Sequence, residues 1–164
     1  MNKATFQGLF NADVNRNYAW IFPIKQIVKD LAAWVHRAIF SEVVTVTDNI
    51  TLTANDSGKT YLVATDAKVI SLPATEAGVK YTFVNTGANG NNIISISPVA
   101  ADGISGTITL AASVVVDAGV VNKDLINTKA TSKVGDSVTI VGTGVTGTGA
   151  WVIVASTGIW AAEG

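Results

Sequence analysis

The tripeptide Gly58-Lys59-Thr60 is the part of the sequence that comes closest to a known binding motif. Phosphate-binding loops end in glycine, lysine and a hydroxyl residue, where the lysine contacts phosphate oxygens and the hydroxyl contacts Mg²⁺. The full motif also needs a glycine five positions before Gly58 and a helix after the loop. Thr53 occupies that position here, and the sequence TYLVAT after Lys59 favours a strand. We therefore expect a turn at Gly58 and no nucleotide site.

Other residues with chemical potential are scattered along the chain. Six aspartates fall mostly in expected turns: Asp48, Asp56, Asp66, Asp102, Asp117 and Asp136. Oxygen ligands from two such loops could hold calcium, but their spacing matches no known calcium loop, and no carboxylate pair has the spacing of an acid/base couple. The single histidine, His36, and the absence of cysteine disfavour a catalytic triad and exclude thiolate sites and disulfides. We predict no catalytic, metal or cofactor site and no enzymatic activity.

The composition excludes further classes of protein. Only 14% of the 164 residues are charged, and 11 basic side chains are balanced by 12 acidic ones, which argues against a nucleic-acid-binding surface. The chain is too hydrophobic to be intrinsically disordered. No run of 18 apolar residues predicts a membrane span, and the N-terminus lacks the apolar run of a signal peptide. Because mean hydropathy is +0.39, we expect the chain to cover its surface by assembly with its own copies or with another body.

The sequence changes character near residue 41. Residues 1–40 hold seven of the twelve aromatic residues and carry a net charge of +3, whereas residues 41–164 carry −4. Such an asymmetry indicates different surroundings for the two parts. We expect an N-terminal arm over 1–22, an amphipathic helix within 23–40 and a β-domain over 41–164.

The expected helix covers 24–39, where apolar residues recur at the spacing of one helical face. Pro23 suits the first turn of a helix, and His36 and Arg37 suit its C-terminal end. Two interpretations of the apolar face are open: it packs on the core of the same chain, or it docks on a partner or on symmetry-related copies. A helix lying on a membrane surface is the weaker third interpretation.

After Ser41 the sequence becomes typical of strands, with 19 valines and 18 threonines over 41–164. Short apolar or alternating runs predict strands at 43–47, 50–53, 60–64, 69–72, 80–85, 93–97, 107–111, 114–116, 137–141, 151–155 and 158–160. Expected turns lie at 55–58, Pro73, 87–90, 102–103 and 135–136, with a flexible glycine-rich loop at 142–149 and a hairpin signal at Asn89-Gly90. This pattern predicts a mainly β fold: a β-sandwich, jelly-roll or barrel-like domain preceded by the arm and one helix.

Residues 50–87 resemble a pattern found in structural proteins of tailed-bacteriophage virions. The resemblance lies in Asp56-Ser57-Gly58-Lys59-Thr60-Tyr61, Ile70-Ser71-Leu72-Pro73 and Gly78-Val79-Lys80-Tyr81-Thr82-Phe83. The C-terminal sequences Gly135-Asp136-Ser137-Val138, Trp151-Val152-Ile153-Val154 and Gly158-Ile159-Trp160 are similar to the same class. Among these proteins, a compact β-domain with a short amphiphilic arm resembles a capsid decoration (cement) protein.

This resemblance implies a non-enzymatic protein on the capsid surface of the virion, made in the host cytoplasm, that stabilises the capsid. It also implies the major capsid protein as partner and a homo-oligomer, commonly a trimer. We expect aromatic residues of the N-terminal part to contact the partner: Phe6, Phe10, Tyr18, Trp20, Phe22 and Trp34. The alternative is a receptor- or glycan-binding domain of a phage head or tail fibre. We also expect Trp151 or Trp160 to be buried.

Overall fold

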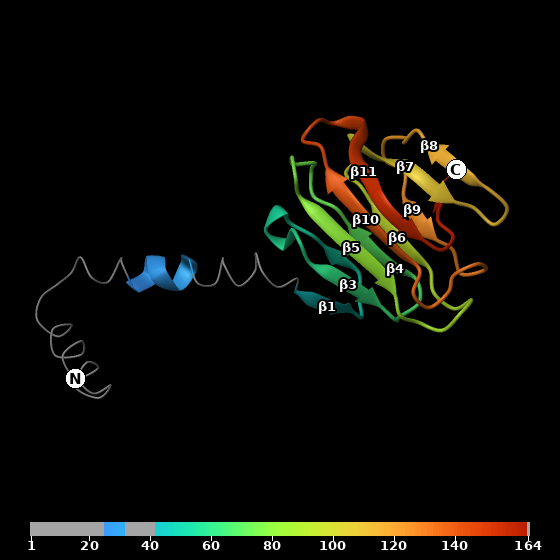
Figure 1. The fold of residues 1–164 in the computed structure, drawn as a ribbon, viewed down its shortest axis with the longest axis horizontal. Helices are drawn as coiled ribbons and strands as arrows, with labels where there is room; N and C mark the ends of the chain where they lie inside the picture. Colours follow the sequence, from blue (N-terminus) through green and yellow to red (C-terminus); the bar gives the residue numbers. More distant parts are fainter. Residues whose placement is uncertain (1–24, 32–41, 164) are drawn as a thin grey trace, which may run out of the picture. The chain divides into compact units, whose positions relative to one another are not determined.

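The computed structural model describes residues 25–31 and 42–163 (Figure 1). The chain divides into two compact units, Met1–Phe40 and Ser41–Gly164. In the first unit, residues 25–31 are helical, within the helix expected at 24–39. The expected arm and the remainder of that helix lie outside the described residues.

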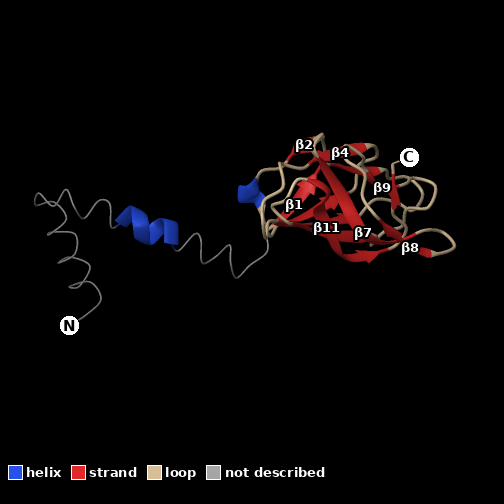
Figure 2. Cartoon of the chain, turned by 90° about the horizontal axis from the view of Figure 1, so that it is seen from above, coloured by secondary structure: helices blue, strands red, loops and turns tan. Residues whose placement is uncertain are grey.

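The second unit is built from strands, as predicted, and its one described helix is a single 3₁₀ turn at Ala54–Asp56 (Figure 2). The strands are β1 (Val43–Val46), β2 (Ile50–Thr51), β3 (Thr60–Val63), β4 (Lys68–Ser71), β5 (Lys80–Asn85), β6 (Ile94–Ser97), β7 (Asp102–Thr109), β8 (Val114–Asp117), β9 (Leu125–Asn127), β10 (Ser137–Gly142), β11 (Gly147–Thr157) and β12 (Ala161–Ala162). They form a seven-stranded sheet in the order β1-β3-β5-β10-β11-β7-β8 and a five-stranded sheet in the order β12-β9-β6-β4-β2.

The first six strands alternate between the two sheets. β1, β3 and β5 lie side by side and parallel in the larger sheet, and β2, β4 and β6 do the same in the smaller one. Each step along the chain therefore crosses from one sheet to the other, so that this half winds like a short solenoid. Parallel pairing needs a crossover, which the strand of the other sheet supplies here in place of a helix.

The C-terminal half adds mostly antiparallel pairs. β10 lies between β5 and β11 and runs antiparallel to both, and β9 pairs antiparallel with β6. β7 runs parallel to β11 and forms a hairpin with β8 at the end of the larger sheet (Figure 1). A register shift between Thr139 and Ile140 marks a bulge in the β10–β11 ladder.

One hydrophobic core takes side chains from both sheets. Strand alternation turns Tyr61, Tyr81 and Phe83 of the larger sheet inward, together with Ile70 and Ile96 of the smaller one. The rings of Tyr61 and Phe83 stack with centroids 5.6 Å apart. Each of these side chains is almost fully buried, so the core fixes which face of each strand points outward.

Several local expectations were wrong. Asn89-Gly90 does not close a hairpin, because β5 and β6 belong to different sheets. Asp102-Gly103 begins β7 instead of forming a turn, and β11 begins at Gly147 within the expected glycine-rich loop. The expected strand at 158–160 is absent, and β9 was not predicted.

Candidate interaction surface

The outward faces of the strands carry almost no charge. On the larger sheet, cross-strand partners such as Thr60 and Thr82 are mostly β-branched or small. Among the described residues, Lys80 is the single charged residue in strand register on that face. The outward positions of the smaller sheet are also uncharged. Surfaces with few charges are typical of the centre of protein interfaces.

The larger sheet also has exposed valines at its β8 end. Val114 and Val116 on β8 are 66% and 79% exposed, and Val154, which the bulge of β11 leaves unpaired, is 56% exposed. Beside them lies a groove of about 380 Å³, lined by Thr107, Thr109, Ile153, Val154, Ala155 and Ser156. We call this region, made of β8 and the groove, the valine end. None of the large apolar side chains that are exposed in the described chain lies on the smaller sheet.

The helix at 25–31 presents a second apolar surface. Ile27, Val28 and Leu31 lie on one helical face, and each has more than half of its surface exposed. A side-chain hydrogen bond of 2.8 Å from Gln26 to Asp30 stabilises the same turn. The partner-binding residues expected from the sequence, Phe6, Phe10, Tyr18, Trp20, Phe22 and Trp34, lie outside the described residues.

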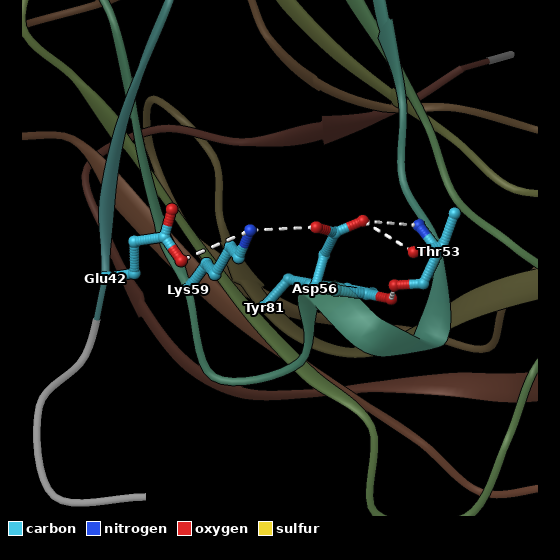
Figure 3. Close-up of polar contacts among 5 residues, drawn as sticks. All are labelled: Glu42, Thr53, Asp56, Lys59 and Tyr81. Atoms are coloured by element: carbon cyan, nitrogen blue, oxygen red, sulfur yellow. Dashed lines mark hydrogen bonds and ion pairs between the residues drawn. The ribbon is translucent and has the colours of Figure 1, made fainter. Parts of the chain in front are cut away.

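Lys59 of the phosphate-loop-like tripeptide belongs to an ion-pair cluster (Figure 3). Its Nζ lies 2.9 Å from Asp56 Oδ1 and 3.3 Å from Glu42 Oε2, and Thr53 donates to Asp56 Oδ2 from both its N–H and its hydroxyl. The hydrogen bond to Asp56 holds the pKa of Lys59 above its ordinary value despite partial desolvation. Burial raises the pKa of Asp56, but its hydrogen bonds with Thr53 and Lys59 lower the pKa by more, so that the net shift is below the ordinary value. The positive charge of Lys59 is thus already balanced by the carboxylates of Asp56 and Glu42. Gly58, at φ +87°, forms the expected turn.

The buried polar residues were not recognised in the sequence. Asn85 on β5, Asn92, Asn127 on β9 and Asp136 are at most 4% exposed. Asn127 accepts from Asn85 at 2.9 Å and donates to Asp136 Oδ2 at 2.8 Å, and Asn92 donates to Asn85 Oδ1 at 2.9 Å. The network satisfies its own amides and joins the two sheets, so it serves structure rather than ligand binding.

Trp151 and Trp160 are both fully buried, which confirms that at least one of them belongs to the core. The Trp151 ring packs on Tyr81 with centroids 5.6 Å apart, and Trp160 Nε1 donates to the Thr157 carbonyl at 3.0 Å. Trp151 Nε1 and Asp102 Oδ1 are buried atoms for which the described part of the chain offers no hydrogen-bond partner. Asp102 Oδ2 accepts from the Thr75 N–H at 2.8 Å.

Comparison with known proteins gives no relative: no protein-family model matches the chain, and no curated protein is significantly similar to it. Within residues 25–31 and 42–163 there is no group of three or more His, Cys, Asp or Glu side chains placed to hold a metal ion. No helix in these two ranges is long and apolar enough to span a bilayer.

Proposed function

We propose that the protein is a non-enzymatic structural component of a phage virion, which decorates and stabilises the capsid through its N-terminal region and an oligomeric β-domain. The observation that carries the proposal is that the outward strand faces carry almost no charge, combined with exposed valines at both ends of the larger sheet, Val43 on β1 and Val114 and Val116 on β8. Single exposed apolar residues are common on monomers, but several on one uncharged surface are typical of proteins that assemble.

The N-terminal helix supports a docking role for the first unit. Ile27, Val28 and Leu31 form an apolar stripe of the kind that amphipathic helices lay into a groove of a partner. The positive charge of residues 1–40 and their aromatic residues favour the same role. The virion and the capsid enter the proposal through the resemblance of residues 50–87 to phage structural proteins.

In the finer architecture, the two sheets face each other as a β-sandwich. The single core supports this arrangement, because Ile70 and Ile96 of the smaller sheet belong to the same cluster as Tyr81 and Phe83 of the larger one. Such a body would leave the outer face of the larger sheet free for contacts between copies.

The proposal is tested on virions of the phage that encodes the chain. Mass spectrometry of purified particles should detect the protein in stoichiometric amounts, and an electron cryomicroscopy map should show β-rich density of this size on the outer head surface. Its absence from the particle, or its location on the tail, contradicts capsid decoration.

The groove beside Val154 favours a second candidate function. Thr107, Thr109 and Ser156 are among the residues that line it, and side chains with hydroxyls can bind the hydroxyls of a sugar. A fibre domain that binds a surface glycan would use this groove. Specific retention of the full chain on a glycan array, lost in Thr107→Val, would favour this candidate over decoration.

A further inference from the structure

Within residues 25–31 and 42–163, one edge of β8 has no neighbouring strand. β8 is the last strand of the larger sheet in these ranges and pairs with β7 alone. The hairpin closes with a bond of 2.8 Å from Leu110 N–H to Ser113 O. Antiparallel partners alternate between bonded and non-bonded pairs. Ile108 and Val115 are therefore a bonded pair, whereas Thr107–Val116 and Thr109–Val114 are not.

Two contacts on the other side of β7 agree with this pattern. The Thr109 carbonyl accepts from Trp160 N–H at 3.0 Å, and the Thr107 carbonyl accepts from Ser156 Oγ at 3.4 Å. Both carbonyls thus point away from β8. Across the ladder, the N–H and C=O groups of Val114 and Val116 must point away from β7 at the free edge, and these are the two residues of β8 whose side chains are exposed.

β8 also lacks the features that protect the strand edges of the smaller sheet. Proteins block edges with very short strands, lysine, proline or bulges. The smaller sheet ends in β2 and β12, which have two residues each, whereas β1 and β8, the end strands of the larger sheet, have four residues each and contain neither lysine nor proline. Its sequence, Val114-Val115-Val116-Asp117, has high β-propensity and a single charge at one end.

We propose that β8 of one chain pairs antiparallel with β8 of a second copy, about a two-fold axis at Val115. In each of two symmetric pairs, Val114 of one copy then lies opposite Val116 of the other. Each pair makes two main-chain hydrogen bonds, so that four bonds satisfy four N–H donors and four C=O acceptors. This pairing specifies which strands form the contact between copies, and it rests on the proposed oligomeric function.

The charges favour a second copy over another partner. A charged edge repels its own copy, but here the one charged residue, Asp117, lies opposite Ser113 in the two-fold register and not opposite itself. Its Oδ1 already accepts from Gly119 N–H at 2.9 Å. A four-residue strand pair covers less than the roughly 800 Å² per partner of a stable interface, so we expect a dissociation constant in the micromolar range.

Disulfide capture tests the register in the full chain, which has no cysteine of its own. In Val115→Cys, the new cysteines of the two copies lie opposite each other across the two-fold axis and form a non-bonded antiparallel pair. Their Cα atoms are then about 4.5 Å apart, a distance at which disulfides form. Under mild oxidation the linked dimer should appear about tenfold faster than with Val145→Cys, because pairing raises the effective concentration of the thiols. Val145, 69% exposed in the turn between β10 and β11, is a stringent control, because Val115 is only partly exposed and packs against the core, so that chance collisions favour the control.

Adding Val116→Lys to Val115→Cys should reduce the rate to that of the control. Equal rates for the two cysteine variants, or a rate that Val116→Lys does not change, overturn the pairing.

Amide exchange of the unmodified chain provides a second test that does not depend on a variant. Protection of Val114 and Val116 should rise with protein concentration, whereas Val115, bonded to Ile108, stays protected throughout. Concentration-independent exchange at Val114 and Val116 overturns the pairing.

These results are separable from the proposed function. A three-fold assembly with unprotected β8 amides overturns the pairing, since an isologous contact closes at two copies, but leaves capsid decoration intact. A β8-linked dimer that is absent from virions overturns the decoration and keeps the pairing.

Discussion

The side-chain amide of Asn85 donates to Oδ1 of Asn127 at 2.9 Å, and this bond connects β5 of the larger sheet to β9 of the smaller one. Asn127 also donates to Asp136 Oδ2 and to the Ile159 carbonyl. The two sheets are therefore joined by oriented polar contacts as well as by the apolar core, and such contacts specify one relative position of the sheets.

Truncation of this link should destabilise the domain strongly. We expect Asn127→Ala to lower the free energy of unfolding by about 3 kcal/mol, because buried polar groups of Asn85, Asp136 and Ile159 lose a partner. Urea unfolding followed by circular dichroism measures the change. Asn91→Ala, at an exposed position, is the control and should stay close to the unmodified protein. Equal midpoints for the two variants would show that the network contributes nothing.

The two buried tryptophans should respond differently to the same substitution. Trp160→Phe loses the bond to the Thr157 carbonyl, whereas Trp151→Phe loses no hydrogen bond to the described residues. We therefore expect Trp160→Phe to cost more, by about 1 kcal/mol, in urea unfolding. Alanine at either position should cost about 3–5 kcal/mol. A melting temperature unchanged by both alanine variants would contradict their place in the core.

Two glycines with positive φ form a matched pair. At Gly158, with φ +82°, a Cβ atom would lie within 1.9 Å of Asp136 Oδ1, whereas at Gly135, with φ +91°, it would meet nothing within 4 Å. Gly135→Ala should cost about 1 kcal/mol from backbone strain alone. Gly158→Ala should cost clearly more, since it also displaces a carboxylate of the buried network. Thermal unfolding that ranks the two variants in the opposite order would contradict the network geometry.

Tyr81 should make the domain sensitive to high pH. Burial, with the negative charges of Asp56 and Glu76, raises the pKa of Tyr81 from 10.0 to about 12, and its hydroxyl donates to the Thr53 carbonyl at 2.7 Å. The unfolded chain ionises first, so this stabilisation is complete below pH 10 and is lost as pH rises toward 12. The free energy of unfolding should therefore fall less steeply over this range in Tyr81→Phe than in the unmodified protein. Parallel curves for the two proteins would show that the phenol ionises equally in both states.

Strand alternation made much of the fold predictable. In β5, the sequence Lys80-Tyr81-Thr82-Phe83-Val84-Asn85 alternates polar and apolar residues up to Phe83, and the structure buries Tyr81 and Phe83 as this period requires. The same period also buries Asn85, the last residue of the predicted strand. Its burial was not predictable, because nothing local reveals its partners Asn92 and Asn127.

Sheet membership was not predictable from local pattern. β1, β3 and β5 pair in parallel although a strand of the other sheet separates each from the next, and the steps from Val43 to Thr60 and from Thr60 to Thr82 differ in length, which hides the repeat. Asn89-Gly90 favours a tight turn wherever it stands, but its hairpin requires neighbouring strands in one sheet. β9 has only three residues between polar neighbours and gives no periodic signal.

The valine end had only a partial signal in the sequence. The run at 114–116 predicts a strand, and it forms β8. Its position at the end of the sheet depends on long-range pairing with β7, so the exposed edge became visible only in the fold.

The most direct test of capsid decoration through the N-terminal region is co-sedimentation with heads that lack the protein. The full chain and a chain of residues 23–164 are mixed with such heads, and occupancy is measured in the pellet, with the circular dichroism spectrum of each chain as the control for folding. The account predicts that the full chain binds and that the truncated chain keeps its β spectrum but stays in the supernatant. Occupancy of the truncated chain equal to that of the full chain would contradict anchoring by the N-terminal region, and failure of the full chain to bind would contradict decoration itself.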